Sequence, residues 1–336
     1  MKKKLMSVLL TAVMAVSLVA CGSTSNGNTN TSQASGNTGS TDGKVYRVGI
    51  CQLVQHEALD AATQGFKDAL TEKLGEGNVE FSEQNAAGDS ATCSTITNQF
   101  VTDGVDLILA NATAPLQAAA SATNQIPILG TSVTDYATAL NIENWSGTTG
   151  TNISGTSDLA PLDEQAAMIK ELFPDKKNIG ILYCSAEPNS VYQSDVITKY
   201  LEDDGYSVKV YTFADSNDVA SVTTSACGES DVIYIPTDNT AASCTEAINN
   251  VAINEGVPIV AGEEGICSGC GVATLSISYY DLGYTTGEMA YEILVNGKDV
   301  SSMEVQYAPT VTKKYNKENC EKLNIKIPDG YEAIEQ

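Results

Sequence analysis

Five carboxylates stand in short polar segments that directly follow apolar, strand-like runs: Asp135, Glu187, Asp238, Glu263 and Glu264. Carboxylates in such places support either neutralisation of a bound ammonium group or the paired acid and nucleophile of a glycosidase. No motif orders them for catalysis, the chain has no Gly-x-Ser-x-Gly elbow, and its one His leaves little scope for a Ser-His triad. We therefore expect a binding protein and no enzyme, with a secreted hydrolase as the weaker alternative.

The same segments contain many hydroxyl and amide side chains but no Lys, and Arg47, the only Arg, stands at the start of the first strand. A phosphate ligand would lack cationic partners there, whereas backbone N–H groups at helix N-termini can hold an isolated carboxylate. The balance favours a zwitterionic or cationic amine such as an amino acid. Thr113, Ser190 and Asn239 have an equally ordinary interpretation as N-caps, whereas Asp238 directly follows an apolar strand and is harder to explain as a cap alone. The expected ligand-binding residues are Gln55, His56, Asn111, Ala112, Thr113, Thr131, Val133, Thr134, Asp135, Ser185, Glu187, Asn189, Ser190, Asp238, Asn239, Glu263 and Glu264.

These segments belong to a regular alternation of short β-branched runs and helical stretches that starts at Lys44. Continuous apolar runs between helices indicate parallel sheets buried on both faces. The alternation breaks into Gly, Thr, Ser and Asn over residues 144–158 and then restarts. We therefore predict the α/β class, with two doubly wound parallel-sheet lobes joined by a hinge and a ligand at the carboxyl ends of the strands.

Further elements follow the second series, which indicates that the chain returns to the first lobe and crosses back again. The expected composition is residues 44–153 with about 272–304 in lobe 1, and 154–271 with about 305–336 in lobe 2. The expected hinge segments are residues 152–158, 262–271 and 308–312.

The N-terminus reads as an export signal. Three Lys precede an apolar run over residues 5–19, which is too short for a comfortable membrane span. The run ends in Leu-Val-Ala-Cys21, which resembles the lipobox of bacterial lipoproteins and implies a signal peptide over residues 1–20 and a lipid on Cys21. Residues 21–43 are almost all Ser, Thr, Asn, Gln and Gly, so we expect a disordered tether. The expected location is the outer face of the cytoplasmic membrane, on a Gram-positive cell surface.

The net charge and the cysteine spacing argue against nucleic acid and metal ions as binding partners. The formal charge is −24, which disfavours nucleic acid because such a surface repels phosphates. Of the nine Cys, only Cys267 and Cys270 form a close pair, and one C-x-x-C without a second pair or a nearby His is weak as a zinc signal. A local disulfide and free thiols remain open for that pair. We expect no metal site and no cofactor.

Several segments together resemble the substrate-binding lipoproteins of ABC importers of the tryptophan/tyrosine type. The resemblance covers nearly the whole body, from residue 45 to beyond residue 289, and is carried by residues 48–60, 130–135, 152–158, 185–190, 236–239 and 279–287. It implies a type I periplasmic-binding fold that closes on an aromatic amino acid, a membrane permease as partner, and a monomer. The stretch Ile266-Cys-Ser-Gly-Cys270 departs from the family's pattern.

The resemblance also implies roles for individual residues. The segments 111–113 and 131–135 would hold the ligand's carboxylate or line the pocket, 187–190 would contribute from lobe 2, and Asp238 would pair with the ammonium group. Tyr136, Tyr280 or Trp145 would pack on the ligand's side chain. A sensory role, or another solute such as a purine or a sugar, stays open because the same fold serves many ligands.

Overall fold

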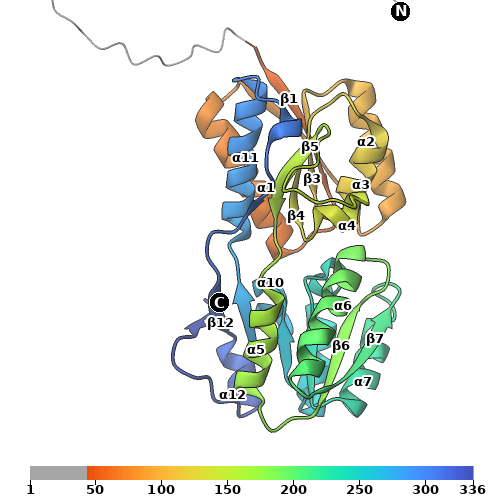
Figure 1. The fold of residues 1–336 in the computed structure, drawn as a ribbon, viewed down its shortest axis with the longest axis vertical. Coiled ribbons are helices and arrows are strands. Elements are labelled where there is room, and N and C mark those ends of the chain that lie inside the picture. The colour runs from red at the N-terminus through yellow and green to blue at the C-terminus, as the bar shows by residue number, and fades with distance from the viewer. Residues whose placement is uncertain (1–43, 336) are drawn as a thin grey trace, which may run out of the picture. The chain divides into compact units, whose positions relative to one another are not determined.

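The structure is a computed structural model that describes residues 44–335, and it contains two β-sheets, each covered by helices on both faces (Figure 1). Cys21, with its predicted lipid, and the predicted signal peptide and tether lie outside these residues. No helix within residues 44–335 is long and apolar enough to cross a membrane.

The first sheet defines lobe 1 and has parallel pairing throughout. Its strand order is β11 (Gln306–Tyr307), β5 (Ile153–Ser157), β4 (Ile128–Val133), β3 (Leu107–Asn111), β1 (Tyr46–Gln52) and β2 (Val79–Asn85). Helices α1 (Glu57–Leu74) and α11 (Tyr279–Leu294) pack on one face. The other face carries α2 (Ser90–Asp103), α3 (Thr113–Ala122) and α4 (Tyr136–Leu140). A short 3₁₀ turn, η1 (Val300–Ser302), follows α11.

The second sheet defines lobe 2. Its order is β13 (Glu332–Ala333), β12 (Thr312–Tyr315), β10 (Ala273–Ser276), β9 (Ile259–Ala261), β8 (Val232–Ile235), β6 (Asn178–Cys184) and β7 (Ser207–Phe213), with only β10 and β12 antiparallel. One face carries α5 (Leu162–Leu172), α6 (Pro188–Asp203) and α12 (Lys317–Lys322). The other carries α7 (Val219–Glu229), α8 (Asn239–Ala242), α9 (Thr245–Glu255) and α10 (Glu264–Cys270).

The chain crosses between the lobes three times: after β5, between β10 and α11, and between β11 and β12. Three of the expected boundaries need correction. The strand β10 pairs with β9 in the second sheet, so residues 272–276 lie in lobe 2 and residues 262–271 are not a crossing. The strands β5 and β11 pair with each other in the first sheet, so residues 154–157 and 306–307 lie in lobe 1.

Helix α11 returns to lobe 1 because its small residues fit against α1, and the two helices lie side by side in Figure 1. A Cβ atom added at Gly65 would collide with the carbonyl oxygen of Tyr280, and one at Gly283 would collide with that of Ala62. Such close backbone approach is possible only with Gly. The last third of the sequence thereby completes the core of the first lobe.

All eight cysteines of the described chain are free thiols. Of the two alternatives for Cys267 and Cys270, the structure therefore has free thiols, and both are buried. Burial raises the pKa of both groups. They pack as small apolar side chains between α10 and the second sheet.

Candidate ligand-binding site between the lobes

The two lobes meet at the carboxyl ends of their strands. His56, which precedes α1, lies with its Nε2 atom 3.2 Å from Oδ1 of Asn239, which begins α8 in lobe 2. Gln193 of α6 points its Nε2 atom at Oγ1 of Thr134, 3.5 Å away, just after β4 of lobe 1. The expectation that the polar segments after the strands come together is therefore met for these residues.

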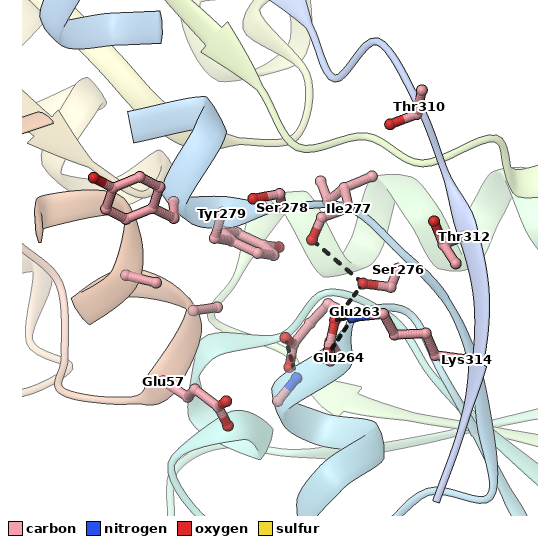
Figure 2. A pocket seen from close by; sticks show the side chains of 14 residues that line it. Glu57, Glu263, Glu264, Ser276, Ile277, Ser278, Tyr279, Thr310, Thr312 and Lys314 are labelled. Atoms are coloured by element: carbon pink, nitrogen blue, oxygen red, sulfur yellow. Dashed lines mark hydrogen bonds and ion pairs between the residues drawn. The ribbon is translucent and has the colours of Figure 1, made fainter. Parts of the chain in front are cut away.

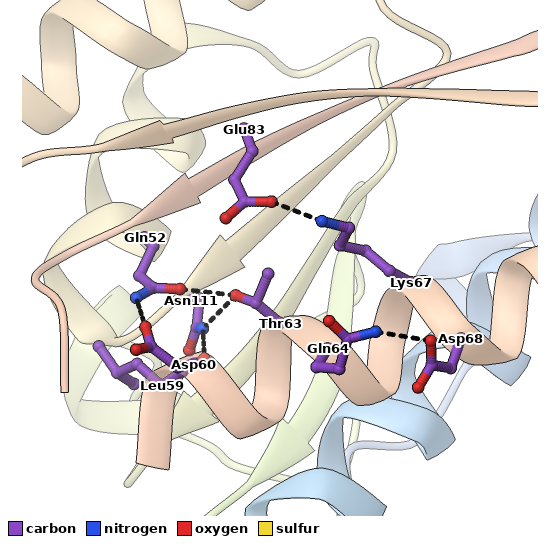
Figure 3. A network of polar contacts seen from close by, with 9 residues as sticks. All are labelled: Gln52, Leu59, Asp60, Thr63, Gln64, Lys67, Asp68, Glu83 and Asn111. Atoms are coloured by element: carbon purple, nitrogen blue, oxygen red, sulfur yellow. Dashed lines mark hydrogen bonds and ion pairs between the residues drawn. The ribbon is translucent and has the colours of Figure 1, made fainter. Parts of the chain in front are cut away.

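A buried polar network lies on the lobe 1 side, beneath the first turns of α1 (Figure 3). Asn111, the last residue of β3, donates from Nδ2 to the carbonyl of Leu59 (2.8 Å) and to Oγ1 of Thr63 (2.9 Å). The Thr63 hydroxyl donates to Oε1 of Gln52 (2.7 Å). Gln52 in turn donates from Nε2 to Oδ1 of Asp60 at 2.7 Å. The Asn111 side chain is thus held by two hydrogen bonds, both from its Nδ2 atom.

Three polar atoms of lobe 1 are buried without a hydrogen-bond partner in the described structure: Nδ1 of His56, Oδ1 of Asn111 and Oγ of Ser132. All three residues stand at or just beyond the carboxyl ends of strands β1, β3 and β4. Native proteins pair nearly all of their buried polar groups, and a cluster of exceptions at one place points to a ligand. Oγ1 of Thr274, on β10, is a fourth such atom and belongs to lobe 2.

The backbone at the same place is held in conformations that non-Gly residues rarely adopt. Ala112 has φ 102° and Ser132 has φ 54°. Both follow strands of the first sheet, and Ala112 lies directly before α3, where it offers no side chain for capping. Strain of this kind costs on the order of 1–3 kcal/mol per residue and is concentrated at binding sites.

Glu187 lies on the lobe 2 side, and its carboxylate is fully engaged within its own lobe. Its Oε2 accepts from the backbone N–H (3.0 Å) and the Nδ2 (2.7 Å) of Asn239. Its Oε1 accepts from the backbone N–H (2.8 Å) and the hydroxyl (2.7 Å) of Thr240. Glu187 therefore holds the loop that leads into α8 and orients the Asn239 amide.

Asp238 is engaged in the same way. Its Oδ2 accepts from the backbone N–H of Cys184 (2.8 Å) and from the hydroxyl of Ser190 (2.7 Å), and its Oδ1 caps α8 at the N–H of Ala241 (2.7 Å). Burial, with a smaller effect of the nearby Glu187 carboxylate, raises the pKa of Asp238. The geometry gives Asp238 three donors from its own lobe, which makes it a structural centre of lobe 2.

Asp158 lies at the first crossing between the lobes and is fully enclosed. It accepts from the hydroxyl of Tyr279 (2.9 Å) and from that of Thr134 (3.1 Å). Burial raises the pKa of Asp158 to about 6, and these two hydrogen bonds oppose the shift. Glu263 is the N-cap residue of α10, and burial raises the pKa of its carboxyl to about 7. One buried carboxylate thus lies at the first crossing and the other in lobe 2, and no Lys or Arg of residues 44–335 donates a hydrogen bond to either.

A cavity of about 290 Å³ opens beside this hinge (Figure 2). Both lobes contribute, with Glu57 from α1 on one side and Glu264 of α10 on the other. Glu264 is occupied by the hydroxyl of Ser276 (2.5 Å) and by an ion pair with Lys314 (2.8 Å). The predicted residues Glu263, Glu264 and Tyr280 gather here, around the hinge cavity, and not with Asn111 and Asn239.

A second cavity, of about 180 Å³, lies between the lobes at the strand ends. Lobe 1 lines it with Leu53, Val54 and the start of α3, and lobe 2 with Glu187 and Asn239, among others. Asn239, whose side-chain oxygen faces His56 of lobe 1, is thus part of the wall of this cavity. In the part of the chain that the structure describes, no group of three or more His, Cys, Asp or Glu is placed to hold a metal ion.

The remaining predicted residues have structural partners. Asp135 caps α4, Thr131 bonds the hydroxyl of Thr156 inside the first sheet, and Ser185 bonds the carbonyl of Phe213. Asn189 and Ser190 belong to the hydrogen bonds around Glu187 and Asp238. Ala112, Thr113 and Val133 are buried at the ends of β3 and β4, and Gln55 is exposed.

The aromatic candidates lie away from the cleft. Tyr136 is buried in lobe 1, where it stacks on Trp145 with ring centroids 6.4 Å apart and donates to the carbonyl of Thr156. Tyr280 is 40% exposed and donates to Asp68 on the outer face of α1 and α11. These contacts hold lobe 1 together.

Sequence reasoning missed Gln52, Thr63, Asp158, Gln193 and Tyr279. Asp158, like Asp238, directly follows a buried strand. That strand is hard to recognise in the sequence because it consists mostly of small polar residues. Thr63 and Gln193 lie inside helices α1 and α6, where no local pattern separates a cleft-facing residue from a surface one.

Comparison with known proteins places this arrangement in a described group. The family model for the ABC transporter substrate binding protein matches residues 47–333. A curated protein of Clostridioides difficile (strain R20291), named tyrosine-binding protein, is 38% identical over 306 residues, which cover 90% of this chain and 87% of that protein.

Two solved structures differ in what they contain. A crystal structure of an ABC domain in complex with L-Trp, from Streptococcus pneumoniae, matches with a TM-score of 0.82 at 30% identity, covering 87% of this chain and 100% of that one. The ligand-free, open structure of a Clostridium difficile substrate-binding protein with adhesive properties matches with a TM-score of 0.66 at 36% identity and the same coverage. The described lobes thus resemble the ligand-bound relative more than the open one, in line with the hydrogen bonds between them.

Proposed function

Because this chain belongs to the family of ABC transporter substrate-binding proteins, we propose that it captures an aromatic amino acid between its two lobes and delivers it to a membrane permease. The observation that best supports an amino acid as the ligand is the composition of the cleft. Buried acceptors lie beside an uncapped helix start, and no strand-end loop contains a Lys or Arg. The aromatic preference is supported by the relatives, one named for tyrosine and one solved with L-Trp.

The start of α3 is the proposed place for the ligand's carboxylate. The first N–H groups of a helix lack partners within the helix, and Ala112 provides no capping side chain. The helix dipole favours a negative charge there, and Thr113 adds a hydroxyl. The neighbouring hydroxyl of Ser132 is buried and unpartnered, which makes it a further donor for the same carboxylate.

Catalysis by paired carboxylates has less support. The family acts by binding. Glu187 and Asp238 accept hydrogen bonds from their own lobe with every carboxylate oxygen, and Glu264 is paired with Lys314. None of these groups is left in the position that an acid and a nucleophile need on either side of a substrate bond.

Proteins of this family work outside the cytoplasm. We propose that this one is anchored by lipid on Cys21, at the outer face of the cytoplasmic membrane of a Gram-positive cell, and works as a monomer. Two acyl chains with about 0.8 kcal/mol per buried CH₂ give a stable anchor. The polar segment 21–43 would act as a leash of about 25 Å mean reach. Labelling of growing cells with a palmitate analogue should mark the wild type and leave Cys21→Ala unmarked.

Calorimetric titration tests the ligand. We expect L-tyrosine, L-tryptophan or L-phenylalanine to bind with one site per chain, and L-leucine, adenosine and glucose to give no heat of binding. In a thermal-shift assay the bound amino acid should raise the melting temperature in proportion to ln(1 + [L]/Kd). Binding of a nucleoside or sugar in place of all three aromatic amino acids would overturn the proposal.

A further inference from the structure

We propose that two one-way hydrogen-bond chains, each starting from a carboxylate, make the cleft select the ligand's ammonium group through neutral acceptors: Oδ1 of Asn111 and Nδ1 of His56. The inference rests on the proposed function and specifies how that site reads an amino acid. It also moves the recognition of the ammonium group away from Asp238, whose oxygens are already taken.

The first chain starts at Asp60 and ends at Asn111 (Figure 3). A carboxylate only accepts, so Gln52 must turn its Nε2 toward Asp60 and its Oε1 toward Thr63. The Thr63 hydroxyl therefore donates its proton in the hydrogen bond to Gln52 and can only accept a hydrogen bond from Asn111.

Asn111 must then direct its Nδ2 toward Thr63 and the carbonyl of Leu59. Its Oδ1 is left facing away from the network, buried and unpartnered among the described residues. Two acceptors therefore hold Asn111 in this orientation: the Thr63 hydroxyl, whose direction is set by the chain from Asp60, and the carbonyl of Leu59, which can only accept.

The second chain starts at Glu187 and crosses the lobes. Glu187 accepts from Nδ2 of Asn239, so Oδ1 of Asn239 faces His56 and requires a proton on Nε2. Burial lowers the pKa of His56, so the ring is neutral and carries that single proton. Its Nδ1 is then a lone pair, buried and without a partner in the described chain.

The two chains end on the same kind of group. Both ends are neutral acceptors, and both lie beside the start of α1, where His56 precedes the helix and Asn111 bonds the carbonyl of Leu59. An ammonium group offers three donors and no acceptor, which suits two such ends. A ligand that lacks the ammonium group leaves both buried acceptors unpaired, and this penalty is the basis of the selectivity. The second chain is complete only when the lobes touch, so closure itself sets the polarity of His56.

The experiment compares each amino acid with its deaminated analogue on the full-length protein. The pairs are L-tyrosine with 3-(4-hydroxyphenyl)propionate and L-tryptophan with indole-3-propionate, titrated by calorimetry. The variants are Thr63→Val, which keeps the shape and removes the hydroxyl, and Thr63→Ser, which keeps the hydroxyl. A third variant, His56→Phe, removes the second acceptor at a partly exposed position whose side chain makes no capping bond.

We expect the wild type to prefer the amino acid over its analogue by at least a hundredfold. Thr63→Val should weaken the amino acid about tenfold and change the analogue less than twofold, whereas Thr63→Ser should match the wild type. His56→Phe also removes the closing hydrogen bond to Asn239, so it should weaken both ligands, and the amino acid about tenfold more than the analogue. An equal loss for both members of a pair would reduce Thr63 to a structural residue and overturn the inference. Wild-type protein that binds amino acid and analogue alike would overturn it too while leaving the proposed function in place; failure to bind any aromatic amino acid would overturn both.

Discussion

The two faces of the cleft are built on opposite principles. On the lobe 1 face, Asn111, Ser132 and His56 keep buried polar atoms without partners, and Ala112 holds a strained backbone. On the lobe 2 face, Glu187 and Asp238 use every carboxylate oxygen on donors of their own lobe. Lobe 1 thus gives up stability at its strand ends, where we propose that it meets the ligand, whereas the two carboxylates of the lobe 2 face are fully paired.

This difference indicates a division of labour. A ligand that pairs with the unpaired groups gains more free energy from lobe 1 than from lobe 2, so we expect it to bind lobe 1 before the lobes close. A face whose polar groups are already paired gains little from the ligand and acts by closing over it. Hinge closure then adds the hydrogen bonds from His56 to Asn239 and from Gln193 to Thr134.

Asp238→Ala in lobe 2 is the strongest test of whether the carboxylates of this face serve structure and not the ligand. The change strands three buried donors, at Cys184, Ser190 and Ala241, and we expect a loss of about 3 kcal/mol in the free energy of unfolding. Urea unfolding of the full-length protein measures this loss. Asp238→Asn, which keeps one acceptor oxygen, should lose less. Affinity for an aromatic amino acid, measured where the variant is folded, should stay within a few-fold of the wild type; a fully stable variant that no longer binds would return Asp238 to the ligand.

The free energy of unfolding should depend on pH through the two buried carboxylates near the hinge cavity. The folded-state pKa values of Asp158 and Glu263 are raised by burial to about 6 and about 7, above their values in an unfolded chain. Between those values and about pH 4 the folded protein binds protons that the unfolded chain does not, so the free energy of unfolding should rise as the pH falls from 8 to 5. For Asp158 the gain between pH 8 and pH 5 is about 1.4 kcal/mol.

Two variants separate these contributions. Asp158→Asn should remove the slope near pH 6, and Glu263→Gln should remove the slope near pH 7, each followed by urea unfolding at a series of pH values. Asn at position 158 still accepts from the Tyr279 hydroxyl, so the fold at the crossing is kept. Stability that decreases steadily from pH 8 to pH 5 in the wild type, with no difference in Asp158→Asn, would show that this carboxyl is ionised in the fold without penalty.

Much of the fold is readable from the sequence because parallel strands buried on both faces leave continuous apolar runs, as at β3 and β8. The lobe boundaries were misplaced where this signal is weak. The strand β5 is Ile-Ser-Gly-Thr-Ser, and β10 pairs with both β9 and β12, contacts that no local pattern reveals.

The sequence predicts which loops meet at the strand ends, among them those of Asn111, Asn239 and His56, because topology alone brings such loops together. Whether a carboxylate faces the cleft or its own backbone depends on side-chain geometry, so the sequence does not separate Asp238 from Asp158. Directional chains such as Asp60 to Asn111 depend on side-chain geometry across β1, α1 and β3, and residue types alone do not encode them.

The finest test of the comparison is Ala112→Gly at the start of α3. Gly adopts φ 102° without strain, so the substitution should raise the free energy of unfolding by about 1 kcal/mol. Affinity for an aromatic amino acid should fall a few-fold, since a looser loop must be ordered on binding. Ala120→Gly, inside the same helix, is the matched control and should lower stability by about 1 kcal/mol. If both substitutions destabilise the protein equally in thermal and urea unfolding, Ala112 stores no strain, and lobe 1 differs from lobe 2 only in its unpaired polar atoms.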